Sequence, residues 1–194
     1  MTNKIQEANL AMVVSKTFSG LNVNALRYLL PLWIAPLTGV TFRCVFAAVA
    51  FWIIGYWEKP ETASVKDKIY LFLLGAVGIY GYMFSYLMGL SKTTPVSAAI
   101  FTSMQPIWVF ILSVFFFNEK ATVMKIVGIL VGLGGALLCI STQKSDDLAS
   151  DAFSGNLFCL VSSVIYAVYL ILSNRFLKRT GPYTLMRYTF SGAA

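Results

Sequence analysis

The 194-residue sequence contains no histidine, only three cysteines and only 12% charged residues. Histidine is the most frequent acid–base residue and a common metal ligand, so its absence removes the usual basis of a catalytic or metal site. Cys44, Cys139 and Cys159 lie inside apolar runs without a CxxC motif. An odd number of such thiols provides neither a disulfide framework nor a zinc site. We therefore expect no catalytic residues, no cofactor and no metal.

Apolar side chains dominate what is present: 58% of the residues are hydrophobic and the mean hydropathy is +0.74. A soluble domain has about 45–50% apolar residues and leaves much of its surface exposed to water. This composition therefore predicts a membrane protein. The net charge of +7 comes mostly from basic residues in short loops. That pattern is typical of membrane orientation rather than of nucleic-acid binding.

Six apolar runs are long enough to cross a bilayer, which requires about 20 helical residues. The runs are continuous rather than alternating, which excludes transmembrane strands. Short loops between them make sequential helices antiparallel neighbours. The expected fold is thus an all-α, multi-pass helical bundle. The runs are Ala8–Leu30, Pro36–Trp57, Ile69–Leu90, Val96–Phe117, Ala121–Ile140 and Asn156–Leu177, and a seventh begins near Tyr183.

Lysine and arginine are distributed unequally between the two sides of this predicted bundle. Nine fall in the N-terminal tail and the even-numbered loops, and three fall on the opposite side. Cytoplasmic loops carry the excess of these residues. The count therefore predicts a cytoplasmic N-terminus in a plasma membrane such as the bacterial inner membrane. The nine are Lys4, Lys59, Lys66, Lys68, Lys120, Lys125, Arg175, Lys178 and Arg179, and the three are Arg27, Lys92 and Lys144.

The sequence also resembles itself at an offset of about 147 residues; for example, Pro36–Thr38 corresponds to Pro182–Thr184. Five helices separate the two copies, so the second copy would enter the membrane from the opposite side, as an inverted repeat. Chance similarity between apolar helices is the alternative explanation. The repeat predicts three segments: a first five-helix unit over 8–140, an extracytoplasmic linker over 141–154, and the beginning of a second unit over 155–194. We therefore expect the chain to represent the first two-thirds of a ten-helix protein.

Several short motifs, in this order and at this spacing, resemble the EamA-like branch of the drug/metabolite transporter superfamily. Ser19 and Arg27 stand where that family usually has Trp and Lys, and Asn118 stands where Gly is frequent. The resemblance implies a carrier built from two inverted repeats. The motifs are Ser19–Arg27 in the first helix, Pro36–Thr38 followed by Arg43, Ser103–Pro106, Asn118–Lys120, the glycines from Gly128 to Gly135, and Gly155–Tyr169.

Polar residues inside the predicted spans are the candidate substrate-binding residues, because intramembrane charges usually face a cavity. At a rise of about 1.5 Å per residue, Asn22 and Arg43 lie at similar depth, so a contact between them is feasible. Lys16 lies beside a polar stripe formed by Ser15, Ser19 and Asn22. Two alternatives remain open. The residues of the stripe can form hydrogen bonds between helices, and long basic side chains can extend toward the membrane interface as topology anchors.

Two further helices supply candidates. Gln105 and Tyr166 offer an amide and an aromatic hydroxyl to the same site. Pro106 lies near mid-bilayer, where a proline removes one backbone hydrogen bond and can act as a hinge or merely curve the helix. Glu119 falls in a tight hairpin, where capping of the next helix is favoured over proton coupling.

These observations predict a membrane carrier that moves a small metabolite, such as an amino acid or another anionic solute, by alternating access. Its expected partners are that solute and the lipid bilayer, not nucleic acid, and a homodimer is left open. The alternative is a non-transporting integral membrane partner or assembly subunit. An enzyme is disfavoured because the spans contain no His, Asp or Glu.

Overall fold

The computed structural model describes residues 2–30, 33–57, 63–117, 122–142 and 151–194. All regular elements in these ranges are helices, so the predicted all-α fold is confirmed. Each of the seven apolar runs contains one to three consecutive helical elements, with ends at or within a few residues of the predicted ones. The elements are α1 (Thr2–Leu29), α2 (Pro36–Trp57), α3 (Val65–Leu74), a π-helical turn η1 (Gly75–Ile79), α4 (Tyr80–Lys92), α5 (Pro95–Ser103), α6 (Gln105–Phe117), α7 (Val123–Thr142), α8 (Ala152–Thr180) and α9 (Pro182–Ala193).

Local sequence signals explain where several helices begin and end. A proline opens α2, α5 and α9, where its missing N–H costs nothing. The Thr94 hydroxyl accepts the Ser97 backbone N–H at the start of α5. The Asp151 carboxylate accepts hydrogen bonds from the side chain and the backbone N–H of Ser154 at the start of α8. These two bonds lower the pKa of Asp151. Between α8 and α9, Gly181 has a φ of 76°, a left-handed conformation that glycine adopts without strain.

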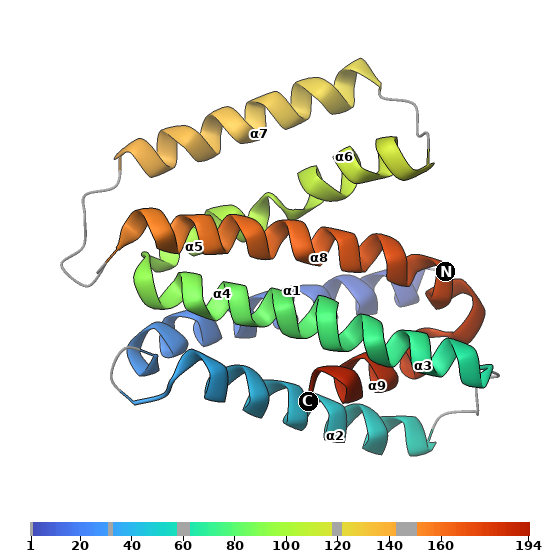
Figure 1. The fold of residues 1–194 in the computed structure, drawn as a ribbon. Helices are drawn as coiled ribbons and strands as arrows, with labels where there is room; N and C mark the ends of the chain where they lie inside the picture. Colours follow the sequence, from blue (N-terminus) through green and yellow to red (C-terminus); the bar gives the residue numbers. More distant parts are fainter. Residues whose placement is uncertain (1, 31–32, 58–62, 118–121, 143–150) are drawn as a thin grey trace.

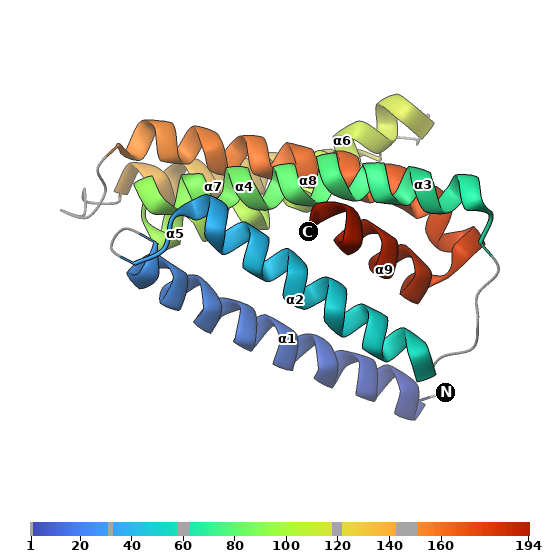
Figure 2. The ribbon, with the colours of Figure 1, turned by 60° about the horizontal axis from the view of Figure 1, so that its bottom comes forward.

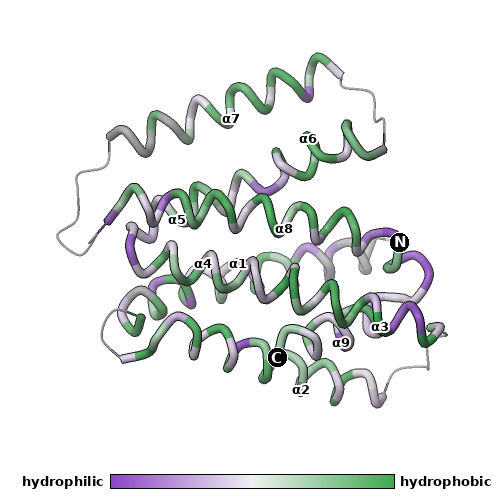
Figure 3. The backbone as a smooth tube through the Cα atoms, viewed as in Figure 1, coloured by the Kyte–Doolittle hydropathy of each residue, from purple (hydrophilic) through white to green (hydrophobic). Residues whose placement is uncertain are grey.

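Four apolar segments within the described residues are long enough to cross a bilayer: Pro36–Trp57, Val65–Lys92, Pro95–Phe116 and Ala152–Thr180. Two of them combine several elements, since Val65–Lys92 contains α3, η1 and α4, and Pro95–Phe116 contains α5 and most of α6. Hydrophobic residues run along most of these helices, and hydrophilic residues gather mainly near helix ends (Figure 3). The structure is that of a polytopic membrane protein.

Helix α8 lies in the middle of the bundle, between α4 on one side and α5 and α6 on the other (Figure 1). Helix α9 packs against α2, α3 and η1. Helix α7 lies along the top edge and α2 along the bottom edge of Figure 1, whereas α1 lies at the outer edge of the bundle in Figure 2. Among the described residues, α8 supplies more buried side chains than any other helix, whereas nearly all described side chains of α1 are exposed.

Backbones approach closely at two helix crossings. A Cβ atom added at Gly75 would overlap the backbone carbonyl of Thr189 on α9, and one added at Gly192 would overlap that of Phe72 on α3. At the other crossing, a Cβ at Gly89 of α4 would lie 2.5 Å from the Cys159 sulfur on α8. Small residues at such crossings allow membrane helices to pack tightly.

The fourth predicted span is interrupted at Met104, between α5 and α6. Two residues later stands Pro106, which has no N–H to donate to the carbonyl four residues before it. The Met104 N–H is shared between the Ile100 and Phe101 carbonyls at 3.2 Å each. From α8, the Ser163 hydroxyl donates to the same Phe101 carbonyl at 2.6 Å. A buried side chain of α8 therefore stabilises the break.

Replacing Ser163 with alanine should destabilise the fold by about 0.6–1.7 kcal/mol, the range measured for interhelical hydrogen bonds in a membrane protein. The buried Phe101 carbonyl would lose the hydroxyl donor that α8 provides. Thermal unfolding in detergent measures the change. Ser103→Ala is the matched control, because the Ser103 hydroxyl is exposed and bonds only within α5, to Ile100. Equal stability of the two variants would contradict this role for Ser163.

Candidate functional site

Four tyrosines from α4 and α8 form a continuous cluster in the buried centre: Tyr82, Tyr86, Tyr166 and Tyr169, hereafter the tyrosine cluster. The rings of Tyr82 and Tyr166 are 4.6 Å apart between the two helices. Tyr82 also stacks on Tyr86 at 6.2 Å, and Tyr166 on Tyr169 at 6.1 Å. Tyr86 and Tyr169 are buried, whereas Tyr82 and Tyr166 remain partly accessible. Tyr82 and Tyr166 are thus the accessible members of the cluster.

The helical spacing of these residues explains the cluster. Tyr82 and Tyr86 are four residues apart, and Tyr166 and Tyr169 are three apart, so each pair lies on one helical face. The extensive packing of α4 against α8 then brings the two faces together. Paired aromatic rings prefer such offset or tilted arrangements.

Polar groups from three other elements reach the tyrosine cluster. The Gln105 side chain, at the start of α6, interacts with the Tyr82 hydroxyl. Thr102, near the end of α5, interacts with Tyr86. Arg43 of α2 is half-buried and close enough to Tyr82 and Tyr86 to act on both electrostatically. A cation, an amide and several hydroxyls therefore surround one set of aromatic rings.

Among the described residues, the carboxylates of Glu7, Asp67 and Asp151 lie near helix beginnings rather than in this cluster. Arg43 accordingly has no ion-pair partner within the described part of the chain. The same residues contain no group of three potential metal ligands. The arrangement is suited to binding an anion that also has an apolar part, because aromatic faces and hydroxyls lie beside the cation.

Three of the five predicted substrate-binding residues, Arg43, Gln105 and Tyr166, thus converge around Tyr82. The other two do not join them: Lys16 and Asn22 are exposed on α1, and no hydrogen bond links Asn22 to Arg43. Pro106 follows the break and is exposed beside Gln105. Glu119 lies outside the described residues.

The predicted polar stripe of α1 and the polar residues of α8 differ in their surroundings. On α8, Ser162, Tyr169 and Ser173 are buried. On α1, Ser15, Ser19 and Asn22 are exposed, because α1 packs little against the other described helices.

Sequence reasoning did not identify Tyr82 as the centre of the site or Thr102 as a partner of Tyr86. The four-residue spacing of Tyr82 and Tyr86 was a usable signal for a shared face. It could not reveal which helix that face contacts, because the packing of α4 against α8 depends on the tertiary structure.

Comparisons with known proteins agree with this architecture. The model of the EamA-like transporter family matches residues 6–141. The uncharacterized transporter YyaM of Bacillus subtilis is 26% identical over 89% of this chain and 57% of its own length. An uncharacterized transporter of Archaeoglobus fulgidus is 27% identical over 91% of this chain and 60% of its own length. The chain thus spans about three fifths of the length of these two curated relatives.

Two further likenesses are more limited. The aromatic amino acid exporter YddG of Ancylobacter novellus is 27% identical over 54% of this chain and 37% of its own length. A solved crystal structure superimposes on 93% of this chain and 64% of its own with a TM-score of 0.59 and 20% identity, a likeness of fold alone.

Proposed function

The chain belongs to the EamA-like transporter family, and from that premise we propose that it forms part of a carrier for a small anionic metabolite, such as an amino acid. The observation that carries the proposal is the convergence of Arg43, Gln105 and Tyr166 around Tyr82. Arg43 would bind the anionic group of the solute. Gln105 would accept a hydrogen bond from a neighbouring polar group of the solute or donate one to it. The tyrosine rings would hold the apolar part of the solute.

An aromatic amino acid has the chemistry that this site favours, because a carboxylate would meet Arg43 while a flat ring packs beside Tyr82 and Tyr166. The name of the Ancylobacter novellus relative, an aromatic amino acid exporter, supports the same choice. Lys16 and Asn22 keep a proposed role on the exposed face of α1, where they would meet the solute on its way to or from the cluster.

We propose transport by alternating access, without covalent chemistry. The units 8–140 and 155–194 would belong to two inverted repeats that rock against each other around the cluster, with the N-terminus in the cytoplasm. Two helices of the first unit that contribute to the site follow an irregular segment: η1 directly precedes α4, and Met104 precedes Gln105 at the start of α6. Such interruptions provide places where a helix can bend between two packed states, with Pro106 as the proposed hinge. The solute then shifts the equilibrium by binding one state better than the other.

Counterflow in proteoliposomes tests this function. Vesicles containing the protein are loaded with one unlabelled compound from a panel of amino acids and organic acids, and entry of the labelled compound is measured. A carrier should show faster entry into vesicles loaded with its own substrate than into empty ones, and the amide analogue without the carboxylate should give no such acceleration. If no compound of the panel enters, the alternative of a non-transporting membrane subunit is favoured instead.

A further inference from the structure

A cavity with several basic residues lies away from the tyrosine cluster, at the end of the bundle where α3 begins and α6 and α8 end. Its volume is about 820 Å³. None of its described lining residues belongs to the tyrosine cluster. The lining comprises Lys66, Asp67, Tyr70, Phe116, Ile171, Leu172, Asn174, Arg175, Phe176, Lys178 and Arg179.

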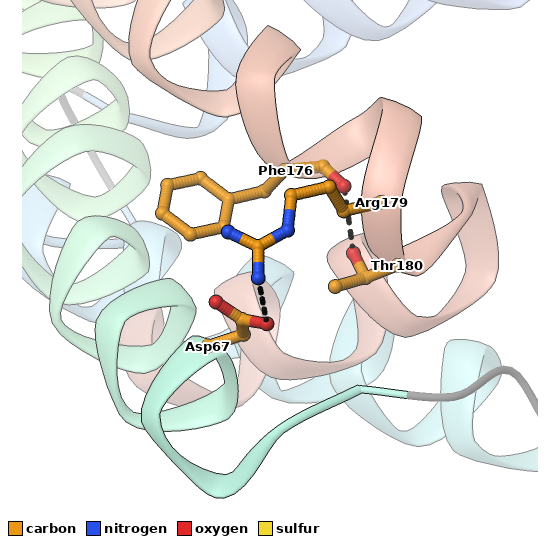
Figure 4. Close-up of polar contacts among 4 residues, drawn as sticks. All are labelled: Asp67, Phe176, Arg179 and Thr180. Atoms are coloured by element: carbon orange, nitrogen blue, oxygen red, sulfur yellow. Dashed lines mark hydrogen bonds and ion pairs between the residues drawn. The ribbon is translucent and has the colours of Figure 1, made fainter.

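The charges in this cavity are unbalanced. Among its described lining residues, four are basic and Asp67 is the one carboxylate. Asp67 is paired with Arg179 at 3.3 Å, an ion pair visible in Figure 4. The pair neutralises one cation and leaves Lys66, Arg175 and Lys178 around the same space. Three like charges at one site repel each other, so an anion that enters would be bound favourably.

The remaining walls of the cavity are apolar. Tyr70 of α3 stacks on Phe176 of α8 with ring centroids 5.1 Å apart, and Phe116, Ile171 and Leu172 complete the surface. Figure 4 shows Phe176 beside the ion pair.

A second cavity of about 540 Å³ shares Ile171, Asn174 and Lys178 with the first and extends between α6 and α8. Its lining is apolar at Val109, Leu170 and Leu177 and polar at Ser113 and Ser173. The basic end therefore borders a mainly apolar groove along the membrane-spanning helices.

We propose that this basic cavity binds a phosphate ester, whose phosphate lies among Lys66, Arg175 and Lys178. A guanidinium can bind two phosphate oxygens at once, and an ammonium adds a point charge beside it. Asn174 supplies an uncharged donor for an ester oxygen. Two sources offer this chemistry, an anionic phospholipid of the adjoining leaflet and a soluble phosphate ester. The apolar groove favours the lipid, because basic pockets between helices at the membrane surface bind lipid headgroups and the groove can hold an acyl chain.

Binding measurements on the purified protein in detergent test the proposal without any transport assay. The probes are dioleoylphosphatidylglycerol, dioleoylphosphatidylcholine and glycerol 1-phosphate, each titrated separately. We expect phosphatidylglycerol to bind more tightly than phosphatidylcholine. The double variant Arg175→Gln/Lys178→Gln should weaken phosphatidylglycerol binding about 25-fold, because each cation contributes about fivefold. The matched control Lys92→Gln/Lys125→Gln, whose cations lie over Phe158 and Phe110 outside the basic cavity, should bind as the wild type does.

A variant with the opposite expected effect serves as a control for misfolding. Asp67→Asn removes the carboxylate and releases Arg179, so phosphatidylglycerol affinity should rise about fivefold. A misfolded protein would not gain affinity. Equal dependence of glycerol 1-phosphate binding on Arg175 and Lys178, without a lipid preference, would identify a soluble ester as the ligand. Unchanged phosphatidylglycerol and glycerol 1-phosphate binding in the double variant, or no binding of either probe, would overturn the proposal.

Discussion

Arg43→Gln should reduce the initial rate of anionic-solute counterflow by about 10- to 100-fold, because a hydrogen bond to a charged group contributes about 1.5–3 kcal/mol. Arg43 is the cation that acts electrostatically on Tyr82 and Tyr86, and no ion pair satisfies it within the described residues. Glutamine keeps a polar side chain of moderate length, so the helix should still insert and pack. Counterflow in proteoliposomes of equal protein content measures the effect.

Two variants make this result specific. Arg43→Lys keeps the charge but loses the planar pair of donors, so it should retain part of the rate. Lys125→Gln makes the same change of charge on the exposed face of α7, outside the cluster, and should leave the rate unchanged. If Arg43→Gln transports the solute at the wild-type rate, Arg43 is a topology anchor that extends toward the interface, and the cluster does not bind an anion through it.

Gly75→Ala should destabilise the protein by about 1–3 kcal/mol, the usual cost of adding a methyl group to a well-packed interior. The added Cβ would overlap the backbone carbonyl of Thr189 on α9, and a backbone carbonyl cannot rotate away as a side chain can. The neighbouring contact of Gly192 with the Phe72 carbonyl fixes the same crossing, so α9 would have to move away from α3 and η1. The midpoint of thermal unfolding in detergent measures the loss.

Gly81→Ala is the control on the same continuous span. The nearest atoms to a Cβ at Gly81 belong to Ile165, at 3.8 and 4.0 Å, which is ordinary contact. Alanine is favoured over glycine inside a helix by about 1 kcal/mol, so this variant should be neutral or slightly stabilised. A Gly75→Ala protein as stable as Gly81→Ala would show that the α3–α9 crossing adjusts without cost.

The positions of the helices were largely predictable from the sequence, because a bilayer imposes length and hydropathy on each segment that crosses it. Pro36–Trp57 was predicted at its observed bounds. The interruption at Met104 was partly predictable, since Pro106 marks a place where the helix must lose a hydrogen bond. The π-helical turn at Gly75–Ile79 was not, because no single residue in it prevents an α-helix.

The candidate site was predictable residue by residue but not as an arrangement. Polarity within apolar spans identified Arg43, Gln105 and Tyr166, because polar groups in hydrocarbon need partners. It identified Lys16 and Asn22 by the same reasoning, yet these are exposed on α1. The polarity of a side chain indicates that it needs a hydrogen-bond or charge partner within the membrane, but it does not indicate which helix provides that partner.

The sequence by itself determined a helical membrane protein of the EamA-like family, because hydrophobic length, loop charge and local motifs are properties of the chain alone. Only the tertiary structure decided that α4 and α8 meet through Tyr82 and Tyr166, and that Arg43 and Gln105 join them. It also decided that Asp67 pairs with Arg179 beside three other cations. The physical reason is that lipid is as apolar as the helix surfaces, so which helices pair depends on shape: glycines such as Gly75 and Gly89 allow close approach where a side chain would forbid it.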